Sequence, residues 1–171
     1  MMKRKWLTAV GIALWALSPW CQATAPSKEV QRGQATRQFF GELRGDYILP
    51  NQPLYEQFGE ALSGPPDPER TLPDGSTLVA GCRYKSCIEK GAMVLGPDGA
   101  VQVAGLIHYQ CHPMTTSKSG YDCKRQAKLT IFEPSRVVST EAVQAIRAWG
   151  QDKMASAVPE IVTVPTPRAS R

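Results

Sequence analysis

Residues 91–107 read Gly-Ala-Met-Val-Leu-Gly-Pro-Asp-Gly-Ala-Val-Gln-Val-Ala-Gly-Leu-Ile, with one apolar run before Pro97-Asp98-Gly99 and another after it. Short apolar runs on either side of a Pro-Asp-Gly turn are typical of a β-hairpin. A second turn of this kind, Pro73-Asp74-Gly75, precedes a further apolar run. Two successive hairpin turns predict an antiparallel meander. The predicted strands cover residues 77–82, 92–95, 100–110 and, further along the chain, 128–132.

Apolar residues at helical spacing flank the meander on both sides. They occur within residues 25–45 and again within residues 53–62. After the meander, Ser139 can cap a third helix, whose predicted buried side is formed by Val143, Ile146 and Trp149. The pattern predicts an α+β fold, in which an antiparallel β-meander sheet is packed by N-terminal and C-terminal helices.

The N-terminus has the three parts of a cleavable signal peptide. A basic segment, residues 1–5, is followed by an uncharged apolar run and by the small-residue pattern Ala23-Thr24-Ala25. We therefore expect an exported protein that resides in the periplasm. The expected organisation is a signal peptide at 1–25, a single domain at 26–157, and a Pro-rich C-terminal tail or edge strand at 158–171, with Ile161 to Val164 as the strand.

The charge of the expected mature chain is low. Three of the 20 Lys and Arg residues, but none of the 15 Asp and Glu residues, precede residue 26, so the net charge after cleavage is +2. Nucleic-acid binding requires basic residues gathered on one face, and a membrane span requires about 20 apolar residues in succession. The mature sequence shows neither feature, so we expect no nucleic-acid binding and no membrane insertion.

Four cysteines follow the signal sequence, which itself contains Cys21. An even number of cysteines in an oxidising compartment predicts two disulfides, for which three pairings are possible. We favour the local pairing of Cys82 with Cys87 and of Cys111 with Cys123, because each pair brackets a short polar stretch.

The residues offer little support for metal binding or catalysis. His108 and His112 are four residues apart, which on a strand separates them by about 13 Å, too far for one ion. His108 fits the core or edge of the sheet better than a catalytic site. Neither a nucleophile motif nor a phosphate-binding glycine loop is present. We expect a protein without catalytic residues, metal or cofactor.

The most distinctive segment lies between the first two cysteines of the mature chain. It consists of Arg83, Tyr84, Lys85 and Ser86, so that two bases flank an aromatic residue. A loop closed by a disulfide loses little entropy on docking, and Arg and Tyr are frequent interface anchors. The segment is therefore the predicted partner-binding loop. The alternative is a solvated hairpin whose disulfide only stabilises the fold.

The sequence around this loop resembles the Ivy family, the inhibitors of vertebrate lysozyme. The resemblance rests on Gly81-Cys82-x4-Cys87, on the apolar runs 91–95 and 103–107, and on the preceding segment 72–78, and it covers about residues 36–110. It implies a periplasmic α+β domain, often a homodimer, whose loop between the cysteines plugs the lysozyme cleft.

The resemblance also implies a role for individual loop residues. In the family, a histidine of this loop meets the catalytic carboxylates of lysozyme. Lys85 stands at that position here, and Tyr84 stands where the family has a proline. The segment 112–122 is an insert relative to the family. If the loop enters such a cleft, we expect Arg83 and Lys85 to pair with cleft carboxylates and Tyr84 to pack on the wall of the sugar-binding site.

Three functions follow as hypotheses. The first is a periplasmic inhibitor of lysozyme-type peptidoglycan glycosidases. The second is an immunity protein against an imported cell-wall hydrolase, which would use the same loop. The third is an envelope interaction or assembly factor that adds a strand of a partner to the predicted edge at residues 161–164.

Overall fold

The computed structural model describes residues 26–113 and 121–165. The predicted signal peptide, most of the predicted insert and the last six residues of the predicted tail lie outside these ranges. None of the helices within these two ranges has the length and apolar character that spanning a bilayer requires.

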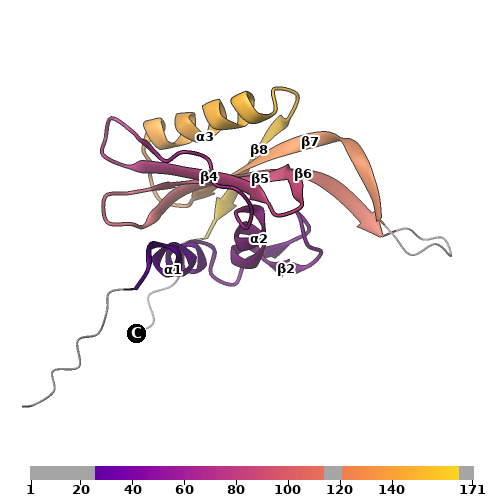
Figure 1. The fold of residues 1–171 in the computed structure, drawn as a ribbon, viewed down its shortest axis with the longest axis horizontal. Coiled ribbons are helices and arrows are strands. Elements are labelled where there is room, and N and C mark those ends of the chain that lie inside the picture. The colour runs from indigo at the N-terminus through magenta and orange to yellow at the C-terminus, as the bar shows by residue number, and fades with distance from the viewer. Residues whose placement is uncertain (1–25, 114–120, 166–171) are drawn as a thin grey trace, which may run out of the picture.

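Three helices and a six-stranded sheet form the described part of the chain (Figure 1). The sheet has the strand order β3-β4-β5-β6-β7-β8, and β1 and β2 form a separate small ladder. Helix α3 covers one face of the sheet, while α1 and α2 cover the other (Figure 1). The predicted α+β fold is confirmed. The elements are α1 (Lys28–Phe40), β1 (Arg44–Gly45), β2 (Gln52–Pro53), α2 (Leu54–Ala61), β3 (Arg70–Thr71), β4 (Thr77–Arg83), β5 (Ser86–Leu95), β6 (Val101–Pro113), β7 (Tyr121–Pro134), α3 (Thr140–Lys153) and β8 (Val158–Val164).

The strands from β3 to β7 pair antiparallel in sequence order, as the two turns predict. Ala92 in the middle of the sheet lies opposite Ala80 on one side and Gly105 on the other. Only the last pairing differs, because β8 runs parallel to β7. Parallel neighbours need a crossover connection, and α3 supplies it by returning the chain across one face of the sheet.

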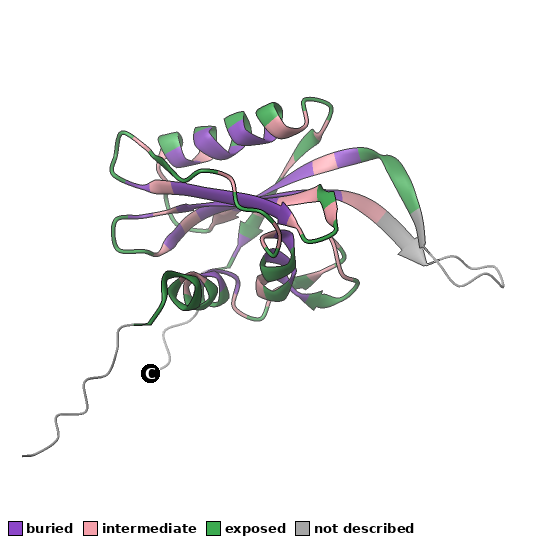
Figure 2. Cartoon of the chain, viewed as in Figure 1, coloured by how far each residue is buried: buried purple, intermediate pink, exposed green. Residues whose placement is uncertain are grey.

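Alternation along the strands divides the core into two layers. Leu78, Ala80, Val94 and Ile107 are among the side chains that pack beneath α3. The neighbouring positions, such as Met93, pack beneath α1 and α2. Figure 2 shows the central strands buried on both faces, whereas the helices are buried along one side only. This burial explains why the strands read as nearly continuous apolar runs.

Two helix ends are set by local residues. The Ser27 hydroxyl accepts a hydrogen bond from the Val30 amide and caps α1, which begins at Lys28. The helix ends before Gly41, whose φ of 54° lies in the left-handed region. In α3 the Ser139 cap forms as predicted. Ile146 and Trp149 are buried as expected, but Val143 is only half-buried because it lies at the margin of the helix face.

Candidate functional site

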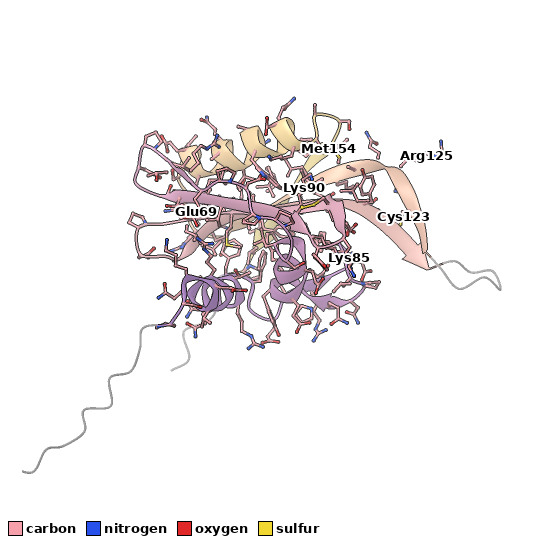
Figure 3. All side chains as sticks on the ribbon, viewed as in Figure 1. Glu69, Lys85, Lys90, Cys123, Arg125 and Met154 are labelled. Atoms are coloured by element: carbon pink, nitrogen blue, oxygen red, sulfur yellow. A yellow bond between two sulfur atoms is a disulfide. The ribbon has the colours of Figure 1, made fainter. Side chains whose placement is uncertain are left out.

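The predicted loop forms the turn of the β4–β5 hairpin. Arg83 pairs with Ser86, so Tyr84 and Lys85 are the two turn residues. Lys85 adopts a φ of 61°, a left-handed conformation that non-glycine residues rarely adopt. Tyr84 is 64% exposed, and Lys85 is exposed as well. The turn therefore presents an aromatic ring and an ammonium group to solvent, next to the C-terminal end of α2 (Figure 3).

A bulge enlarges the hairpin just before its turn. Cys82 pairs with Lys90, whereas the next residue, Arg83, pairs with Ser86. Three residues of β5, Cys87 to Glu89, therefore have no counterpart on β4. The predicted disulfide between Cys82 and Cys87 is present, with a Cα–Cα distance of 4.8 Å. It ties the bulge to the last regular pair of the ladder.

Only part of the second predicted disulfide lies within the described residues. The backbone register places Cys111 opposite Cys123, and Cys123 is engaged in a disulfide. The side chain of Cys111 lies outside the described residues, as does that of His112. The register is the one that the predicted pairing requires.

The segment after α2, Ser63 and Gly64, is hydrogen-bonded to the β4–β5 hairpin. The Tyr84 amide donates to the Ser63 hydroxyl at 3.1 Å, and the Gly64 amide donates to the Cys82 carbonyl at 2.8 Å. A Cβ atom on Gly64 would lie 2.6 Å from the Cys82 carbonyl oxygen. Only glycine allows this approach, so the packing of residue 64 fixes the base of the loop.

This packing gives the first testable prediction. Gly64→Ala forces the backbone of the hairpin away from residue 64, and we expect the free energy of unfolding to fall by about 1–3 kcal/mol. Gly59→Ala in α2 is the matched control, because a Cβ there meets nothing within 4 Å. The control should raise stability by about 0.5–1 kcal/mol through helix propensity. Urea unfolding of both variants checks the sign, and a Gly64→Ala variant as stable as wild type would contradict the packing.

The three basic side chains of the hairpin have different partners. The Arg83 guanidinium lies 2.7 Å from a carboxylate oxygen of Glu89 and 3.7 Å from one of Glu60. Lys90 donates its ammonium protons to the Cys87 carbonyl. Lys85 instead lies over the Tyr84 ring, with its Nζ 5.2 Å from the ring centroid. Among the described residues no carboxylate pairs with Lys85, so it is the cation that the hairpin offers to a partner.

A groove runs beside the hairpin, between α1, α2 and strands β4 and β5. Its volume is about 660 Å³, and Ser63 and Gly64 lie on its rim. Its lining includes the apolar residues Phe58, Leu62, Val79 and Met93. Neither His nor Cys occurs among the described lining residues. The groove therefore combines apolar side chains with the charged residues Glu29 and Arg32 of α1, which also line it.

His108 lies in the sheet and not in this site. It is 1% exposed, and its Nε2 lies 2.8 Å from the Thr130 hydroxyl. The Thr130 hydroxyl also approaches Glu160 at 3.4 Å, and Glu160 is paired with Lys128. Burial lowers the pKa of His108 to about 4. The ring is therefore neutral near pH 7 and belongs to the core, as the sequence predicts, although no pattern in the sequence indicates its link to Glu160.

The structure brings together all four residues of the predicted loop, but in different settings. Tyr84 and Lys85 face solvent, Ser86 is half-buried, and Arg83 is held by two carboxylates. The contributions of Glu60 and of Ser63-Gly64 were not predicted, because they come from a segment about 20 residues away in the chain. Among the described residues, no group of three or more His, Cys, Asp or Glu side chains is placed to hold a metal ion.

No family model, curated protein or solved structure matches this chain. The resemblance of residues 36–110 to the Ivy family stays a prediction from the sequence.

Proposed function

We propose that the protein is a periplasmic inhibitor of lysozyme-type peptidoglycan glycosidases that acts by binding rather than by catalysis. The observation that carries this proposal is the disulfide-closed hairpin, which holds Tyr84 and Lys85 outward. Its partner is a glycosidase cleft, and the resemblance to the Ivy family supports the same assignment.

The mechanism follows from the chemistry of the target. Glycosidases cleave with two carboxyl groups that must hold defined protonation states. An ammonium group placed against one carboxylate fixes that group in its ionised form and occupies the space of the sugar. Because the turn is already closed by a disulfide and anchored to Ser63, little conformational entropy is lost on docking. Tyr84 adds contact area against the wall of the cleft.

The experiment is an inhibition assay with the mature protein and an animal c-type lysozyme. Wild type should inhibit, and Tyr84→Ala should weaken inhibition about 10-fold, as loss of an aromatic anchor does. Ile161→Asp is the control, because Ile161 is exposed on β8. Equal inhibition by wild type and Tyr84→Ala would reject the loop as the binding element. A wild type that inhibits no lysozyme but binds a cell-wall amidase would favour the immunity protein instead.

One observation favours a second candidate, the envelope assembly factor. Strand β8 forms an outer edge of the sheet, and its side chains Val158 and Ile161 are 44% and 53% exposed. An open edge can accept a strand from a partner. Pro159 opposes this, since it provides no backbone N–H donor. Loss of partner binding in Ile161→Asp, with inhibition by the hairpin unaffected, is the result that this candidate predicts.

A further inference from the structure

The two bases of the loop are not equivalent. The Arg83 side chain is 28% exposed and is paired with Glu89, whose side chain is only 14% exposed. If Arg83 turned toward a partner, Glu89 would remain half-buried without its counter-ion, which is costly. Arg83 therefore holds the bulge against the body of the protein.

The bulge, in turn, exposes an aliphatic residue that the loop sequence does not include. Neighbouring side chains of an extended segment point to opposite sides. Glu89 points toward Arg83, and Ile88 is 58% exposed. Exposed apolar side chains that lie together mark interaction sites, whereas single ones are common on any protein surface. Tyr84 and Ile88 are the two exposed large apolar side chains of this hairpin: Tyr84 lies with Lys85 in the turn, and Ile88 is the third residue of β5.

We infer that the partner-binding surface consists of Tyr84, Lys85 and Ile88, and that Arg83 is a positioning residue. The inference rests on the proposed function and narrows the partner to a glycosidase cleft that has one ionised carboxylate beside an apolar wall. One unpaired ammonium group matches one ionised carboxylate, and two apolar side chains match an apolar wall beside it. A cleft with two ionised carboxylates and no such wall does not fit this surface.

The first arm of the test replaces Ile88 by aspartate. Binding of the mature protein to a c-type lysozyme is measured by calorimetry, and Ile88→Asp should weaken it at least about 10-fold, because an apolar contact is lost and a charge is buried. Val137→Asp is the matched control, since Val137 is fully exposed at 100% and lies between β7 and α3. The control should bind like wild type. Equal binding by Ile88→Asp would overturn the inference.

The second arm separates positioning from direct contact at Arg83. Arg83→Gln leaves Glu89 unpaired and should weaken binding about 5- to 10-fold. Arg83→Gln combined with Glu89→Gln removes both charges, so binding should recover to within about threefold of wild type. A double variant as weak as the single one would show that Arg83 touches the partner. Near-ultraviolet circular dichroism and thiol titration of each variant verify that the fold and the disulfide are intact.

The outcomes distinguish this inference from the proposed function. If wild type inhibits lysozyme but Ile88→Asp binds like wild type, or the double variant binds as weakly as Arg83→Gln, the inference alone fails. If wild type neither binds nor inhibits any lysozyme tested, the proposed function and the inference fail together.

Discussion

Lys85→Glu should reduce inhibition of a c-type lysozyme at least about 100-fold. The variant places a carboxylate where the ammonium group faces the ionised carboxylate of the target, so attraction is replaced by repulsion in a desolvated cleft. A 100-fold change corresponds to about 2.7 kcal/mol, well within the range for disrupted interfacial charge pairs. The inhibition constant of the mature protein measures this loss.

The control for this variant is Lys124→Glu. Lys124 is an exposed cation on β7, and the substitution changes the net charge by the same amount. Steering by net charge would affect both variants alike, and at physiological salt it is largely screened. We expect Lys124→Glu to inhibit like wild type. Similar losses in the two variants would show that overall charge, and not the position of Lys85, governs binding.

The second large effect concerns stability at acidic pH. The pKa of His108 is lowered from 6.5 to about 4 by burial, so the folded protein prefers the neutral ring. Between these two values the unfolded chain takes up a proton that the folded chain does not. The neutral His108 ring therefore makes its full contribution to the free energy of unfolding above pH 6.5. This contribution, about 3 kcal/mol in total, is lost as the pH falls toward 4.

Urea unfolding of wild type and His108→Gln between pH 4 and pH 7 tests this prediction. The glutamine does not titrate, while the neighbouring Glu160, Lys128 and Tyr47 are common to both proteins. As the pH falls, the free energy of unfolding of wild type should decrease relative to that of His108→Gln, so that the difference between the two proteins becomes smaller. If the difference stays constant over this range, His108 is not the source of the acid sensitivity.

Much of the fold follows from local signals in the sequence. The Pro-Asp-Gly turn at 97–99 lies between two apolar runs and the one at 73–75 precedes an apolar run, and hairpin formation depends mainly on such turns and on the neighbouring strands. The direction of β8 could not be predicted in this way. Its parallel pairing with β7 depends on how α3 packs on the sheet, through side chains such as Ile146 and Trp149. Such packing is not encoded in the strand itself.

The site shows the same division between local and distant information. The disulfide between Cys82 and Cys87 and the exposure of Lys85 agree with the spacing of the cysteines and the polar residues between them. The pairing of Arg83 with Glu60 depends on a contact across about 20 residues of sequence. Ile88 lies just outside the ring closed by the cysteines, and its exposure results from the bulge. No pattern in the sequence indicates a bulge of this kind.

Site-specific photocrosslinking tests the proposed binding surface most directly. Tyr84 is replaced by p-benzoylphenylalanine, the mature protein is irradiated with a c-type lysozyme, and the joined peptides are sequenced. We predict that residue 84 crosslinks to peptides lining the catalytic cleft, and that the same probe at residue 137 gives no crosslink. Inhibition without any crosslink from residue 84, or crosslinks that map away from the cleft, would contradict the account.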